Sequence, residues 1–213
     1  MAKECDSKTC DKSSCEGCAS KKNPQSMQAA MNAMSNVKHV IGIVSGKGGV
    51  GKSSLTVLLA SYLHYTLGHD VLVMDCDYPQ WSIHAQRERE LSLIEHDDYH
   101  KLLLIRQFKA TGRKIWPLLA AGPTTALKNV EEFLAAAAEP YDYVLFDLPG
   151  TTAIPGVLPL IAQLDRVFIP LKADKIVMES SITFARTLTE SFIPNKYALS
   201  LIHISEPTRL GMI

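Results

Sequence analysis

The sequence lacks both a net charge and a long apolar run. Its 213 residues hold 22 lysine and arginine side chains against 22 aspartate and glutamate side chains, so charge gives no reason to expect a nucleic acid or an anionic membrane as partner. No apolar run approaches the ~18 residues that span a bilayer, and the polar N-terminus has no signal-peptide apolar region. We therefore expect a cytoplasmic protein without a transmembrane segment, whose cysteines stay reduced.

Cysteines are missing from most of the chain. Cys5, Cys10, Cys15 and Cys18 are spaced C-x4-C-x4-C-x2-C, and none follows Cys76. Four thiolates on a polar segment can hold an iron–sulfur cluster or a zinc ion, although the spacing matches no zinc-finger pattern and no histidine lies nearby. Three interpretations stay open: a 4Fe–4S cluster, zinc, or an unstructured thiol-bearing extension. Cys76 lies in an apolar strand and is expected to be a small core residue.

A glycine loop at residues 46–53 carries the clearest chemistry. It follows an apolar run that predicts a buried strand and precedes an apolar pattern with helical spacing. Glycines let the backbone approach a phosphate, and the N-terminus of the helix adds N–H donors. Lys52 can then reach the β- and γ-phosphates of ATP, and Ser53 can bind Mg²⁺. The expected nucleotide-binding residues are Gly46, Lys47, Gly48, Gly49, Val50, Gly51, Lys52, Ser53, Ser54 and Asp147.

Apolar runs alternate with helical patterns, which predicts an α/β fold with a doubly wound, mostly parallel sheet. Pro117 makes residues 114–119 a weaker strand that suits a sheet edge, and Pro170 is expected to close a strand. Ligands in such sheets bind at the carboxyl ends of the strands, where the glycine loop falls. Buried strands are expected at residues 40–44, 71–74, 143–146 and 167–169.

Helices are expected at residues 83–110, in two pieces, and at residues 124–139. The charged segment 87–90 within the first of these is expected to form a solvated face. Two further amphipathic helices are expected to bury their apolar positions, which are Leu55, Leu58, Leu59, Tyr62 and Leu63 in one and Met178, Ile182, Ala185, Leu188 and Phe192 in the other.

Three aspartates follow predicted strands. Asp147 ends the strand at 143–146, a position from which it can hold Mg²⁺ through water beside Ser53. Asp75 and Asp77 follow the strand at 71–74. The alternative for all three is an ordinary role in capping a turn.

The segment from Lys47 to Ser53, K-G-G-V-G-K-S, resembles the deviant Walker A motif of the MinD/ParA/Mrp class of P-loop ATPases. The resemblance implies slow ATP hydrolysis and an ATP-dependent homodimer, in which Lys47 touches the partner's nucleotide and assists Lys52. The segment D-C-D-Y-P-Q, which begins at Asp75, resembles the D-x-D-P-Q switch of ParA proteins with Tyr78 inserted. By that resemblance Asp77 orients the attacking water and Asp75 supports the magnesium shell.

The resemblance changes along the chain. Residues 1–53 resemble Mrp/ApbC-type iron–sulfur carriers, residues 54–197 resemble ParA-family ATPases, and residues 199–213 are similar to translated sequencing-adapter sequence. The organisation this implies is a flexible cysteine-rich head at 1–24, a linker helix at 25–36, a C-terminally truncated P-loop ATPase domain at 37–197 and a non-native tail at 198–213.

Three functions follow. The first is a ParA/MinD-type switch whose ATP-driven dimer positions or partitions DNA or other cargo, with non-specific DNA and a partition protein as partners. The second is an Mrp-type ATP-dependent iron–sulfur cluster carrier that serves apo-protein targets, although the later C-x-x-C of such carriers is missing. The third is a chimeric fragment without function.

Overall fold

The computed structural model describes residues 36–46, 48–192 and 200–205. The chain divides into two compact units, Met1–Met31 and Asn32–Ile213, and the described residues all belong to the second. The cysteine-rich head, the linker helix except for its last residue, and Lys47 therefore lie outside the described residues.

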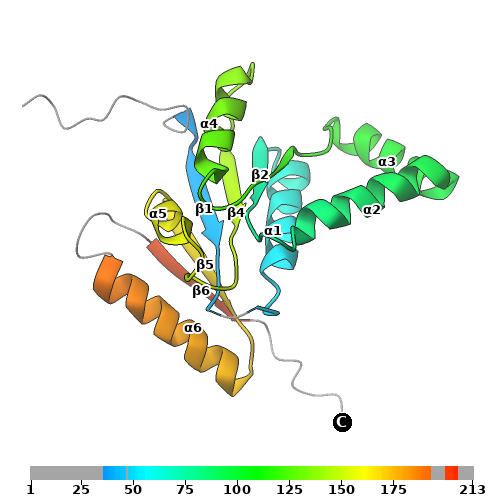
Figure 1. The fold of residues 1–213 in the computed structure, drawn as a ribbon. Coiled ribbons are helices and arrows are strands. Elements are labelled where there is room, and N and C mark those ends of the chain that lie inside the picture. Colours follow the sequence, from blue (N-terminus) through cyan, green and yellow to red (C-terminus); the bar gives the residue numbers. More distant parts are fainter. Residues whose placement is uncertain (1–35, 47, 193–199, 206–213) are drawn as a thin grey trace, which may run out of the picture. The chain divides into compact units, whose positions relative to one another are not determined.

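The described part of the chain forms a parallel six-stranded sheet with strand order β3-β2-β4-β1-β5-β6 (Figure 1). The predicted α/β fold with a parallel sheet is thus confirmed. The strands are β1 (His39–Ile43), β2 (Val71–Asp75), β3 (Leu118–Ala120), β4 (Tyr143–Asp147), β5 (Arg166–Leu171) and β6 (Ser200–Ser205).

The two prolines that mark strands behave differently. Pro117 directly precedes β3, which lies at the sheet edge as predicted. The prediction that Pro170 closes its strand is wrong, because β5 continues to Leu171 and still pairs with β6 there. The Phe168 carbonyl accepts a hydrogen bond from the Val44 N–H on the β1 side, and the pairing of β5 with β1 ends at Phe168. Residue 170 faces the same side as residue 168, so an N–H at position 170 would find no partner in β1. A proline is tolerated where no ladder bond is lost.

Six α-helices connect the described strands. The predicted two-piece helix is confirmed as α2 and α3, which lie side by side and are separated at Asp97, whose side chain accepts a hydrogen bond from the N–H of Tyr99. Both α1 and α6 continue into a π-helical turn, at Tyr62–Thr66 and Leu188–Phe192. The helices are α1 (Lys52–Ser61), α2 (Ser82–His96), α3 (Asp98–Thr111), α4 (Ala126–Ala136), α5 (Val157–Ile161) and α6 (Lys175–Thr187).

The predicted apolar face of α1 is confirmed in part, because Leu63 is buried and Leu55 and Leu59 pack against the same cluster. Leu58 is 68% exposed and Tyr62 is 54% exposed, whereas Thr56 and Ala60 are fully buried. A helix that packs closely on a sheet needs small residues at the contact, so side-chain size decides here over hydrophobicity.

The same reversal occurs in α6, where Met178 and Ile182 are exposed and Ser181 is buried. The predicted burial of Ala185 and Leu188 is confirmed. Large apolar residues on a helix do not by themselves identify the buried stripe, because isolated exposed ones are common.

The charged segment 87–90 is not simply a solvated face. The guanidinium of Arg87 stacks on Trp116, with Cζ 4.1 Å from the ring centroid, and its Nη1 donates to the Trp116 carbonyl at 3.2 Å. Burial lowers the pKa of Arg87. Glu88, Arg89 and Glu90 are exposed as predicted.

Two hydrophobic clusters cover the two faces of the sheet. Alternate residues of β2 point to opposite faces, so Leu72 joins one cluster and Val73 the other. In Figure 1, α4, α5 and α6 lie on one side of the sheet and α1 and α2 on the other. Cys76 is fully buried in the first cluster, which confirms its predicted core position, and burial raises the pKa of its thiol well above the usual range.

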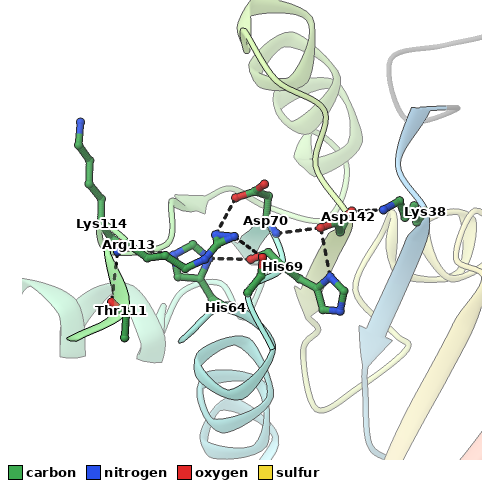
Figure 2. Close-up of polar contacts among 9 residues, drawn as sticks. Lys38, His64, His69, Asp70, Thr111, Arg113, Lys114 and Asp142 are labelled. Carbon is green, nitrogen blue, oxygen red and sulfur yellow. Dashed lines mark hydrogen bonds and ion pairs between the residues drawn. The ribbon is translucent and has the colours of Figure 1, made fainter. Parts of the chain in front are cut away.

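A polar network ties together the amino ends of three central strands (Figure 2). The Asp142 carboxylate, just before β4, contacts Lys38 Nζ at 2.6 Å, His69 Nδ1 at 3.2 Å and the Asp70 N–H at 3.0 Å. Arg113 Nη1 in turn contacts Asp70 at 3.0 Å. The Lys38 hydrogen bond in particular lowers the pKa of Asp142 to about 2. This network stabilises the amino-terminal end of the sheet, which lies opposite the glycine loop.

Candidate nucleotide site

The glycine loop leaves the sheet at its centre, because β1 lies between β4 and β5. Gly49 and Gly51 have φ values of +79° and +84°, a region that favours glycine. Gly51 offers no side-chain cap to α1, so the first N–H groups of the helix remain for an anion. A Cβ added to Gly48 or Gly49 would meet no heavy atom within 4 Å. The loop therefore has the backbone and the open space that a phosphate needs.

Gly46 has a different structural reason for being glycine. A Cβ there would lie 2.8 Å from both the carbonyl oxygen and the Oγ of Ser180 in α6. Ser180 Oγ also donates a hydrogen bond to the Gly46 carbonyl at 3.0 Å. This glycine permits contact with α6, and Ser180 is a supporting residue that no motif in the sequence indicates.

Ser53 and Asp147 meet below the loop. Register pairing places Asp147 opposite Ile43 and Asp75, at the carboxyl ends of three adjacent strands. Ser53 Oγ donates to Asp147 Oδ2 at 2.5 Å. Asp147 is fully buried, and its Oδ1 has no hydrogen-bond partner among the described residues. Lys52 is also buried, at 5% exposure. The sequence predicted all three residues as neighbours of the phosphates, and the fold brings them together.

The buried carboxylate of Asp147 has too few hydrogen-bond donors around it to stabilise its negative charge. Burial raises its pKa to about 7, and the hydrogen bond from Ser53 only partly opposes this effect. A cation beside Oδ1 would stabilise the charged form. Hydroxyl and carboxylate oxygens are ligands that Mg²⁺ accepts, with water and phosphate oxygens completing the octahedron. The residues present therefore fit the predicted magnesium ion.

Asp75 is already engaged with backbone groups. Its Oδ2 accepts hydrogen bonds from the N–H groups of Ile83 at 3.0 Å and His84 at 3.1 Å, and its Oδ1 accepts from the Asp77 N–H at 3.1 Å. Asp75 thus has the capping role that the sequence left open as the alternative, since it caps both the turn at Asp77 and the N-terminus of α2. Its predicted support of the magnesium shell stays a prediction.

Asp77 has a freer carboxylate. Its side chain is half-buried and lines the same cavity as Lys52. Burial raises the pKa of Asp77, and the positive charge of Lys52 opposes that shift. A carboxylate in this position can accept a hydrogen bond from a water molecule beside the phosphates.

A cavity of about 590 Å³ is lined by Lys52, Ser53 and Asp77. The loop from Gly48 to Ser54 forms one wall, Asp77 and α2 another, and residues 149–151 a third. The sequence prediction missed the contribution of α2, which places Gln86 and Arg89 on the cavity. Their spacing of four and seven residues from Ser82 was a visible signal, because such positions share one helix face.

Several predicted site residues receive no test from this geometry. Lys47, Cys5, Cys10, Cys15 and Cys18 lie outside the described residues, so their roles stay predictions. Among the residues that are described, no group of three or more histidine, cysteine, aspartate or glutamate side chains is arranged to hold a metal ion. Within the same residues, no helix is long and apolar enough to cross a membrane.

Comparison with known proteins agrees with the site. A family model described as ParA: NUBPL iron-transfer P-loop NTPase matches residues 36–155. The iron–sulfur cluster carrier protein of Saccharolobus solfataricus is 30% identical over 173 residues, which cover 75% of this chain and 58% of that protein. The chromosome-partitioning ATPase Soj of Thermus thermophilus is 29% identical over 165 residues, which cover 70% of this chain and 61% of Soj.

Among solved structures, MinD of Aquifex aeolicus is 26% identical with a TM-score of 0.50, and the match covers 76% of this chain and 68% of that one. The chain spans less than two thirds of the length of the two curated relatives described above. The family model nevertheless matches more than half of the chain and includes the loop, Ser53, Asp77 and Asp147. The chain therefore belongs to the P-loop NTPase family described as ParA: NUBPL iron-transfer P-loop NTPase.

Proposed function

We propose that the protein binds MgATP in the cavity above α1 and hydrolyses it slowly, as a switch of the ParA/MinD type. The observation that carries this proposal is the pair Ser53 and Asp147, in which a buried carboxylate keeps one oxygen unpartnered among the described residues. An ordinary structural aspartate at a strand end has both oxygens hydrogen-bonded or hydrated, because an unpaired buried charge is costly. A cation site explains the arrangement.

Each residue of the site has a role that follows from its position. The backbone N–H groups of the loop and the Lys52 ammonium hold the phosphates. Ser53 and Asp147 would hold Mg²⁺, which would supply positive charge to neutralise the phosphate oxygens. Asp77, across the cavity, orients the attacking water and accepts its proton. Catalysis of phosphoryl transfer depends mainly on such positioning and charge stabilisation.

Two substitutions test the proposal. Lys52→Ala should weaken MgATP and MgADP binding at least tenfold, about 1.4 kcal/mol, because it removes a charge-assisted contact. Asp77→Ala should keep ATP binding and lose turnover. Lys128→Ala, an exposed lysine on α4, is the matched control. Calorimetry and phosphate release measure the two effects, and wild-type affinity in Lys52→Ala would remove the central claim.

The ATP-bound state is proposed to be a homodimer that positions or partitions DNA or other cargo. This part rests on the resemblance to Soj and MinD. If DNA is the cargo, binding should require ATP and weaken steeply with salt, because phosphate contacts release counterions.

A second candidate function is an ATP-dependent carrier of iron–sulfur clusters. The family model and the archaeal relative, each named for iron transfer or cluster carrying, favour it. The cluster would be cargo held by Cys5, Cys10, Cys15 and Cys18 and passed to apo-proteins. A brown protein that absorbs near 400 nm after anaerobic reconstitution, with no ATP-dependent DNA binding, would favour this function over the first.

A further inference from the structure

Helix α2 presents two different faces. Ile83 and Arg87 face the protein, where Ile83 is 2% exposed and Arg87 stacks on Trp116. Gln86 and Arg89 line the cavity beside the glycine loop. The second face therefore belongs to the nucleotide site, although it lies outside the motifs that define it.

Arg89 is a positively charged residue on this face of α2 without a partner among the described residues. Arg87, two residues earlier, is paired with Trp116, and Gln86 donates to Glu90 at 2.8 Å. Arg89 makes no hydrogen bond or ion pair with any described residue. A long cationic side chain beside an anion site, without an internal partner, is available to a ligand.

The position of Arg89 on α2 places it on the same cavity as the glycine loop. Arg89 lies about 10 Å along the helix from Ser82, at 1.5 Å per residue. Side chains on a helix lean toward its N-terminus, and the N-terminus of α2 is held at the site by Asp75. Arg89 lines the same cavity as Asp77 and Lys52, and a side chain that leans toward the N-terminus of α2 leans toward the end of the helix held by Asp75.

We propose that Arg89 contacts the terminal phosphate of ATP bound in its own subunit, so that the site discriminates ATP from ADP. This inference rests on the proposed function. The γ-phosphate lies on the Asp77 side of the cavity, because Asp77 orients the water that attacks it. A guanidinium matches phosphate oxygens in two parallel hydrogen bonds. Since ADP lacks that phosphate, Arg89 adds affinity for ATP alone.

The test is the ratio of ATP to ADP affinity, measured by calorimetry with Mg²⁺ on the full chain. Arg89→Ala should lower ATP affinity about tenfold and change ADP affinity by less than about twofold. Arg89→Lys should recover only part of the loss, since it restores the charge without the fork. Alanine is a good helix former, so an exposed helix position should tolerate it. Arg106→Ala, on an exposed position of α3, is the matched control and should leave the ratio unchanged.

The outcomes separate this inference from the proposed function. If the wild-type chain binds neither nucleotide, both are wrong. If wild type binds both nucleotides, Lys52→Ala loses both, and Arg89→Ala keeps the wild-type ratio, only the role of Arg89 is wrong. A loss in Arg89→Ala that appears only at protein concentrations where dimers form would overturn the contact within one subunit.

Discussion

Replacing Asp147 by asparagine should stabilise the nucleotide-free protein while removing its magnesium site. The Asp147 carboxylate is buried beside Ser53, and one of its oxygens has no partner among the described residues. The measurement is made with a chelator, so that no Mg²⁺ compensates this charge. Its pKa rises from 3.8 to about 7 on folding. Each pH unit corresponds to about 1.36 kcal/mol, so the charged form costs up to about 4 kcal/mol of folding free energy.

The sign of the pH dependence follows from that displacement. The folded state binds the proton more tightly than the unfolded state, so the wild type gains stability from this group below pH 4 and loses it as pH rises through 7. Asparagine does not titrate. Asp147→Asn should therefore be about as stable as the wild type at pH 4. At pH 8, its free energy of unfolding should exceed that of the wild type by about 2–4 kcal/mol.

Urea unfolding at several pH values, followed by circular dichroism, measures the difference. Asp98→Asn, at a fully exposed position, is the control and should show no such growth with pH. Saturating MgATP should reverse the order, because a ligand that binds the native state stabilises it and the variant binds less. A difference that stays constant from pH 4 to pH 8 would refute the reasoning.

Three further predictions concern other parts of the chain. Lys47→Ala should keep nucleotide binding yet fail to dimerise with ATP, and light scattering that shows the same ATP-dependent mass as wild type would contradict this. Deletion of residues 1–24 should leave nucleotide affinity unchanged and abolish bound iron or zinc, as elemental analysis after anaerobic reconstitution would show. Asp142→Asn should cost about 2 kcal/mol of unfolding free energy at pH 7, because the folded pKa of Asp142 is about 2. That loss should shrink as pH falls from 4 toward 2, and a loss independent of pH would exclude this cause.

The elements that position the site could be predicted from sequence because their patterns are locally unambiguous. β2 and β4 are short apolar runs that end in aspartate, and the glycine loop lies between an apolar run and a helical pattern. Each signal depends only on neighbouring residues. The parallel sheet then brings Asp75 and Asp147 to one register position, as expected where strand ends share one edge.

Features that depend on contacts between distant elements were not predictable in this way. Leu58 is exposed and Thr56 buried because α1 packs closely on the sheet, which hydrophobicity alone does not reveal. The contact of Gly46 with Ser180 joins residues 134 positions apart. Arg87 and Arg89 are two residues apart in one charged segment, and only the packing of α2 makes one a core partner of Trp116 and the other a lining residue of the cavity.

Asp75 connects the phosphate site to α2. Its carboxylate accepts hydrogen bonds from the N–H of Asp77 and from the N–H groups of Ile83 and His84 in the first turn of the helix. The intervening segment contains Trp81, a non-glycine residue with φ +39°, whose buried indole N–H has no partner among the described residues. Strained, unsatisfied residues of this kind occur in switch segments, where an alternative arrangement relieves the cost. The Asp75 carboxylate thus ties the backbone of Asp77, which lines the cavity, to the first turn of the helix that carries Arg89.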